Sequence, residues 1–268
     1  MTIMERLQEH YNEALQYFPE DRIVGIFLQG SQNYGLDVEN SDVDTKLIVV
    51  PTFEDIAFNN KPYSTTHFRD NQEHIDFKDI RLYMQTFRKQ NLNFLEILFT
   101  PYKIINPLYE AEWNRLVEAK EAITHMNPYR AVQSMRGMVL EKFHAMEHKY
   151  PTKIDIIDKY GYDSKQLHHL LRMEECLEKY INGEPYEALL RPSDPEALKW
   201  EKTHFRPLEE ARSIAVAART HAEEIAERFC STIGKEEDPA VVELLNDVQR
   251  NIMRLAIAME FERERFEI

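Results

Sequence analysis

The spacing of apolar residues changes along the chain. Apolar runs rich in β-branched residues cover positions 23–28 and 44–50 and predict two buried strands, and His74–Phe77 predicts a third. Farther along, apolar residues recur at helical spacing. The expected helices cover residues 4–18, 78–88, 93–99, 128–149, 163–181, 205–232 and 239–265, and a loop with a short strand is expected over 52–73.

These elements divide the chain near Asn127-Pro128, because proline favours the first position of a helix. Strands and helices mix before this point, and only helices are expected after it. The predicted fold class is therefore an α/β (α+β) domain with a small mixed sheet over residues 1–126, followed by an all-helical domain over residues 127–268.

The composition is that of an ordinary globular protein, with 43% apolar and 30% charged residues. No apolar segment approaches the roughly 20 residues that span a bilayer, and the start lacks the apolar stretch of a signal peptide. A cytoplasmic protein without a membrane partner is expected. Cys176 and Cys230 show no CxxC spacing. A zinc site is therefore not expected, and free thiols fit a reducing cytosol, although the sequence leaves a disulfide open.

The formal net charge is -14, and both predicted domains are acidic. Neither therefore has the charge of a generic nucleic-acid-binding domain. The window 128–172 is a local exception, with eight Lys and Arg, five Asp and Glu, and four His. Such a window can bind phosphates, or it can be ordinary charge scatter on solvated helices, and composition alone favours the second interpretation.

Gly30-Ser31 follows the first predicted strand. Glycine permits a tight turn, and the next N–H groups with the Ser31 hydroxyl can bind phosphate oxygens where a helix starts. Taken alone, such a pair is more often a plain loop.

Three aspartates follow at separate positions. Asp42 and Asp44 would project the same way if both lay on the strand, and two adjacent carboxylates favour a bound cation such as Mg²⁺. Alternatively, Asp42 lies in a solvated turn and only Asp44 begins the strand. Asp76 lies between apolar residues, as on a buried strand, or else it caps the helix that follows.

The order of these motifs resembles the nucleotidyltransferase fold of the DNA polymerase beta superfamily. The resemblance is strongest to a bacterial and phage branch of predicted nucleotidyltransferases, related to the RNA-repair-associated polymerase beta family, and covers about residues 23–175. Relatives often carry Arg-Gly shortly after the second aspartate, whereas Thr45-Lys46 follows Asp44 here, so detailed substrate preference is not transferred. The matching segments are GSQNYG at 30–35, SDVD at 41–44, HID at 74–76, NLNFLEIL at 91–98 and GYDSKQLHHLLR at 161–172.

The resemblance implies a chemistry for these residues. Asp42 and Asp44 would bind two Mg²⁺ (or Mn²⁺) ions, and Asp76 would complete the catalytic site. Gly30 and Ser31 would bind the β and γ phosphates of a nucleoside triphosphate. A nucleoside monophosphate would pass to a hydroxyl acceptor with release of pyrophosphate.

Lys165, His168 and Arg172 share one face of a predicted helix. Periodicity alone favours a solvent-facing polar stripe. The resemblance raises the alternative that Lys165 and Arg172 bind triphosphate oxygens and that His168 donates a hydrogen bond. Tyr34 can likewise stack on a base or simply pack.

The leading functional prediction is a metal-dependent nucleotidyltransferase whose acceptor is an RNA end, a small molecule or a protein. An antitoxin-like transferase that modifies a partner protein is an alternative. A non-catalytic nucleotide-binding or interaction module on the same fold is another, but the presence of all three aspartates favours an enzyme. The residues name neither the nucleotide, the acceptor nor the oligomeric state, nor whether the helices after about residue 175 bind a partner.

Overall fold

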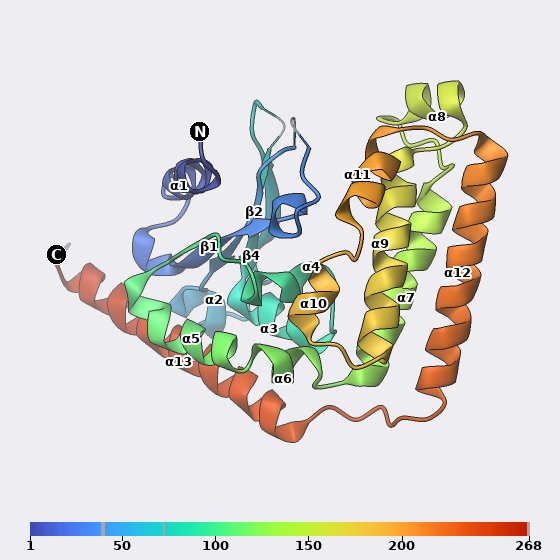
Figure 1. Ribbon diagram of the computed structural model, residues 1–268. Coiled ribbons are helices and arrows are strands. Elements are labelled where there is room, and N and C mark those ends of the chain that lie inside the picture. The colour runs from blue at the N-terminus through green and yellow to red at the C-terminus, as the bar shows by residue number, and fades with distance from the viewer. Residues whose placement is uncertain (39–40, 72, 267–268) are drawn as a thin grey trace. The chain divides into compact units, whose positions relative to one another are not determined.

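A computed structural model describes the chain over residues 1–38, 41–71 and 73–266 (Figure 1). Within these residues a small mixed sheet of five strands is followed by a helical region, which confirms the predicted fold class. Every strand described there precedes residue 106. None of the helices described is long and apolar enough to cross a membrane.

The chain forms two compact units. They separate after Met126, which is the position of the predicted boundary, but the final helix belongs to unit 1 and not to the helical unit 2. That the units correspond to independently folding domains stays a prediction. Unit 1 comprises Met1–Asn33, Asn40–Met126 and Glu237–Ile268, and unit 2 comprises Tyr34–Glu39 and Asn127–Glu236.

The sheet of unit 1 has the strand order β3-β4-β2-β1-β5. β2 and β4 run parallel, and the other neighbours are antiparallel. The three strands expected from β-branched and apolar runs are confirmed, each to within two residues of its expected ends. The strands are β1 (Ile23–Gln29), β2 (Asp44–Val49), β3 (Ser64–Phe68), β4 (His74–Asp79) and β5 (Lys103–Ile105).

One face of this sheet is apolar because side chains alternate along each strand. It packs on helix α1 (Ile3–Ala14), whose first turn is fixed by a capping box between Thr2 and Glu5. α1 was expected to continue to residue 18 but ends at Ala14. The shared core contains Leu7, Tyr11, Phe18, Ile26, Leu47, Val49, Ile75 and Phe77.

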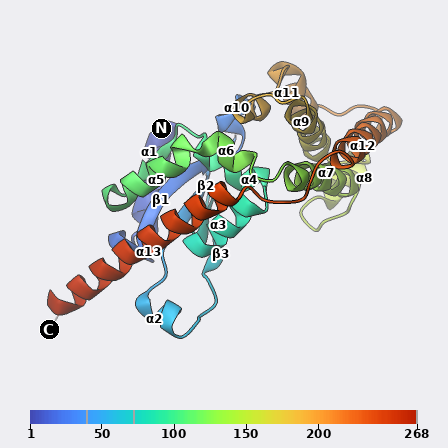
Figure 2. The ribbon, with the colours of Figure 1, turned by 90° about the horizontal axis from the view of Figure 1, so that it is seen from below.

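The opposite face carries Phe27 of β1, whose ring lies 4.4 Å from that of Trp113 in α5 (Glu110–Glu118). Helix α13 (Pro239–Phe266) packs along α5 and α3 (Ile80–Arg88), as Figure 2 shows. Asp79 caps α3 by accepting the N–H of Arg81 at 2.8 Å, so this helix begins two residues after its predicted start.

Unit 2 is built on three helices that pack together, namely α7 (Pro128–Ala145), α9 (Ser164–Ile181) and α12 (Leu208–Cys230). α12 buries a row of alanines at about one-turn spacing, and small side chains let helices approach closely. Periodicity missed several shorter helices, which bury too few residues to leave a pattern. They are α2 (Phe53–Ala57), α6 (Lys120–Thr124), α8 (Ile154–Tyr160), α10 (Tyr186–Leu190) and α11 (Pro195–Thr203), together with α5. The 93–99 helix is confirmed as α4 (Leu92–Leu95) and a following 3-10 turn, Glu96–Leu98.

Replacing Leu47 tests the packing of the sheet on α1. Leu47 is fully buried, and Leu47→Ala should lower the free energy of unfolding by about 2–5 kcal/mol, because a cavity remains in the core. Leu15→Ala is the matched control: Leu15 directly follows α1 and is 40% exposed, so a change within about 0.5 kcal/mol is expected. Chemical denaturation followed by circular dichroism measures both, and equal losses would contradict this packing.

Candidate functional site

The pairing of β2 with β4 brings two of the predicted aspartates to one face of the sheet. Lys46 pairs with Asp76 in this parallel register, and two residues earlier on each strand Asp44 lies beside His74. Residues two apart on a strand share a face. Ile75, between His74 and Asp76, points into the core under α1. Asp44 and Asp76 therefore both lie on the opposite face of the sheet.

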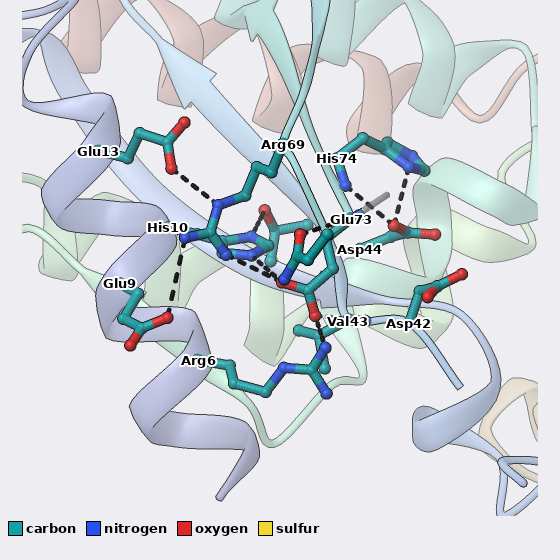
Figure 3. Close-up of polar contacts among 12 residues, drawn as sticks. Arg6, Glu9, His10, Glu13, Asp42, Val43, Asp44, Arg69, Glu73 and His74 are labelled. Atoms are coloured by element: carbon teal, nitrogen blue, oxygen red, sulfur yellow. Dashed lines mark hydrogen bonds and ion pairs between the residues drawn. The ribbon is translucent and has the colours of Figure 1, made fainter. Parts of the chain in front are cut away.

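His74 orients Asp44 through two contacts with the same oxygen (Figure 3). Asp44 Oδ1 accepts the backbone N–H of His74 at 3.2 Å and lies 2.8 Å from its Nδ1. Because a carboxylate oxygen accepts, Nδ1 carries the proton in this contact. The sequence offered a signal for this role, since His74 stands two residues before Asp76 on the same strand.

A buried cation lies beside Asp76. The Lys46 Nζ is 3.9 Å from Asp76 Oδ2, donates to Gln29, and lies 4.6 Å from the centre of the Phe94 ring. Burial lowers the pKa of Lys46 to about 8, although the charges of Asp76 and Asp44 act in the opposite direction. The alternative in which Asp76 caps a helix is wrong, because Asp76 is within β4 and Asp79 caps α3.

Asp42 precedes β2 and is exposed, so strand alternation does not set its direction. In this respect the solvated-turn alternative is correct. The backbone carbonyl of Asp42 accepts a hydrogen bond of 2.8 Å from Gln32 Nε2, which ties it to the segment after Gly30-Ser31. Figure 3 shows the Asp42 and Asp44 side chains turned away from the cluster around Glu73.

The Gly30-Ser31 turn lies at the same end of the sheet, because Gln29 pairs with Asp44 in the antiparallel register. Gly30 has φ of 97°, a left-handed conformation that favours glycine, and Ser31 begins a three-residue 3-10 helix. Asn33 supports the turn by donating to the Leu28 carbonyl at 3.0 Å and accepting the Thr100 hydroxyl at 2.6 Å.

On the α1 face, a buried polar cluster surrounds Glu73, which is 1% exposed. Sequence patterns do not reveal this cluster, because an isolated Glu outside the motifs carries no periodic or spacing signal. Glu73 contacts Arg6, Arg69 and Asn71, and it accepts the Val43 N–H at 3.1 Å.

In unit 2, the polar stripe of α9 is not a solvent-facing one. Lys165 is exposed, but His168 and Arg172 are buried. His168 Nδ1–H donates to the Leu198 carbonyl at 2.7 Å, and burial lowers the pKa of His168 to about 4. The neutral ring therefore presents only an acceptor at Nε2, so donating to a phosphate would require His168 to gain a proton.

Arg172 has a buried guanidinium with unused donors. Its side chain is 7% exposed, and its Cζ lies 3.8 Å above the centre of the Tyr34 ring, which supports the packing interpretation of Tyr34. Among the residues that the structure describes, Arg172 Nε and Nη2 find no hydrogen-bond partner. Buried donors without partners cost free energy, and a bound anion would satisfy them.

The donor chemistry at the sheet end suits a hard divalent ion, because Asp42, Asp44 and Asp76 all offer carboxylate oxygens and two of them share a face. Over residues 1–38, 41–71 and 73–266, no three His, Cys, Asp or Glu side chains are gathered closely enough to form a complete metal site.

Comparison with known proteins shows the family of this chain. Residues 1–174 match the family described as the RNA repair pathway DNA polymerase beta family. None of the curated proteins matches the chain. A solved structure of a nucleotidyltransferase-like protein from Exiguobacterium sibiricum 255-15 is 14% identical, with a TM-score of 0.32, and the alignment covers 97% of this chain and 80% of that chain. Because the family match spans more than half of the 268 residues, the chain belongs to the RNA repair pathway DNA polymerase beta family.

Proposed function

We propose that this chain is a metal-dependent nucleotidyltransferase, which transfers a nucleoside monophosphate from a nucleoside triphosphate to a hydroxyl and releases pyrophosphate. The observation that carries the proposal is the shared face of Asp44 and Asp76 beside the Gly30-Ser31 turn. Membership of a polymerase beta family supports nucleotide transfer in general. The aspartates supply carboxylate oxygens that can hold the divalent ions this chemistry requires.

Asp42, Asp44 and Asp76 are the proposed ligands of Mg²⁺ or Mn²⁺. When bound, these ions would neutralise the triphosphate and lower the pKa of the attacking hydroxyl. Within the chain, both His74 contacts hold Oδ1 of Asp44 in place, and the proposed metal contact would use the other carboxylate oxygen. Lys46 adds a positive charge on the same face.

The proposed phosphate contacts come from Gly30, Ser31, Lys165 and Arg172. The left-handed Gly30 turns the chain so that the following backbone N–H groups can point at a phosphate. Arg172 has two buried nitrogens, Nε and Nη2, without a hydrogen-bond partner among the described residues, and the exposed Lys165 adds a second positive charge. His168 would join them as a donor only in its protonated form.

The acceptor is proposed to be an RNA end, in keeping with the description of the family. Small molecules and proteins, the latter in an antitoxin-like role, are the other acceptors to test. A non-catalytic nucleotide-binding or interaction module is the competing function. Asp42, Asp44 and Asp76 are all present, which favours the enzyme.

Removing either strand aspartate should abolish transfer. Asp44→Asn and Asp76→Asn are each expected to lower the rate by about a hundred-fold or more, since a lost metal ligand removes several kcal/mol of charge stabilisation. Each α-labelled nucleoside triphosphate is incubated with Mg²⁺ or Mn²⁺ and with RNA or protein acceptors. The exposed Asp70 provides a matched control, and Asp70→Asn should keep the wild-type rate. Labelling that survives both site substitutions would rule out this assignment.

Arg172 should matter for the nucleotide and not for folding. Arg172→Met keeps a long side chain over Tyr34 but removes the unpaired donors, so unfolding temperature should hold while nucleotide affinity falls about ten-fold or more. Lys165→Ala should weaken binding in the same direction. Arg191, whose side chain is 72% exposed, gives the control Arg191→Met. Titration with labelled nucleotide measures the affinity. Wild-type affinity in Arg172→Met and Lys165→Ala would show that Arg172 only packs and does not bind the nucleotide.

A further inference from the structure

Both chain neighbours of Asp44 are held from the α1 face of the sheet. Glu73 accepts the Val43 N–H at 3.1 Å (Figure 3), and His10 Nδ1 lies 3.0 Å from the Thr45 hydroxyl. His10 and Glu73 also contact each other, with Nε2 and Oε2 separated by 3.0 Å. The His10–Glu73 pair therefore links the two residues that flank Asp44: Glu73 contacts Val43, and His10 contacts Thr45.

The protons in this pair can be assigned from its partners. Glu73 is surrounded by arginine and amide donors, so its carboxylate is ionised and only accepts. His10 Nε2 must then carry a proton and donate to Glu73. Burial lowers the pKa of His10 to about 4, so the ring is neutral and Nδ1 accepts from the Thr45 hydroxyl.

The cluster is rigid because its polar groups are buried and paired. His10 and Thr45 have no exposed surface, and Glu73 has 1%. Arg69 Nη1 lies 2.9 Å from Glu73, and Arg6 approaches the other carboxylate oxygen. A buried network with satisfied partners fixes one geometry, whereas an unpaired buried charge would be strongly destabilising.

The Val43 N–H needs a side-chain acceptor because Val43 lies just before β2, outside the backbone hydrogen bonds of the sheet. β2 begins at Asp44, so the Val43 N–H reaches a side chain, Glu73, in place of a strand carbonyl. With Val43 and Thr45 fixed toward α1, alternation directs the Asp44 side chain to the opposite face, where it meets His74.

We propose that the His10–Glu73 pair is a positioning device for Asp44, which fixes the direction of this carboxylate toward a bound divalent ion by holding Val43 and Thr45. The proposal rests on the proposed function, in which Asp44 is a metal ligand. Neither His10 nor Glu73 touches the ion or the nucleotide. They act through the backbone and hydroxyl of the residues on either side of Asp44.

The test removes single contacts from the full chain and measures Mn²⁺ binding by electron paramagnetic resonance. Thr45→Val keeps the shape of the side chain but removes the hydroxyl that donates to His10 Nδ1, and Glu73→Gln removes the charge of Glu73. Groups that orient a metal ligand typically contribute 10–100-fold to metal affinity, so each variant should bind Mn²⁺ about ten-fold or more weakly. The Mg²⁺ concentration needed for half-maximal transfer should rise in parallel, with little change in kcat at saturating Mg²⁺.

Glu13→Gln is the matched control. Glu13 lies on the same helix and accepts from Arg69 Nε at 2.8 Å, but none of its contacts reaches residues 43–45. Its Mn²⁺ affinity should equal that of the wild type, and thermal unfolding should show all variants folded. If Glu73→Gln does not fold, Thr45→Val alone decides.

The results separate this proposal from the function on which it rests. Wild-type Mn²⁺ affinity in Thr45→Val and Glu73→Gln, together with lost affinity in Asp44→Asn, would overturn the positioning role and leave the metal site standing. Equal Mn²⁺ binding by wild type and Asp44→Asn would overturn both. Weaker binding in Thr45→Val with an unchanged Glu13→Gln supports the positioning role.

Discussion

The parallel pairing of β2 with β4 is the constraint on which the site depends. These strands belong to segments some thirty residues apart, and their register decides which side chains become neighbours. Asp44 comes beside His74, and Lys46 comes beside Asp76. A slip of one residue in either strand would reverse the faces of that strand and turn its aspartate toward the apolar core under α1. The buried apolar face therefore enforces the geometry of the polar one.

Each face of this sheet contains a buried charged side chain, which would be strongly destabilising without polar partners. On the polar face, Lys46 is 3% exposed and is compensated by Asp76, Gln29 and the Phe94 ring. On the α1 face, Glu73 is compensated by arginines and by His10. Removing one partner from such a group leaves an uncompensated charge, which costs far more than the intact interaction contributes. The contacts of Lys46 and of Glu73 therefore both limit the movement of the strand ends that carry the aspartates.

Burial also determines which side chains of α9 in unit 2 can bind an anion. Helical periodicity places His168 and Arg172 together, but their surroundings give them different properties. His168 donates its Nδ1 proton to the Leu198 carbonyl and stays neutral, whereas Arg172 Nε and Nη2 have no hydrogen-bond partner within the part of the chain that the structure describes. Burial favours the neutral form of a histidine, whereas a guanidinium holds its proton too tightly to lose it in proteins and can still bind an anion.

The sequence by itself determined the fold class, the strands around Asp44 and Asp76, and the family resemblance, because these depend on local periodicity and on motifs that lie close in the chain. It did not determine the end of α1, the return of α13 to unit 1, or the burial of Arg172, which depend on packing between distant segments. The His10–Glu73 pair is the clearest case. Its members lie 63 positions apart, and only strand register and the docking of α1 bring them to either side of Asp44.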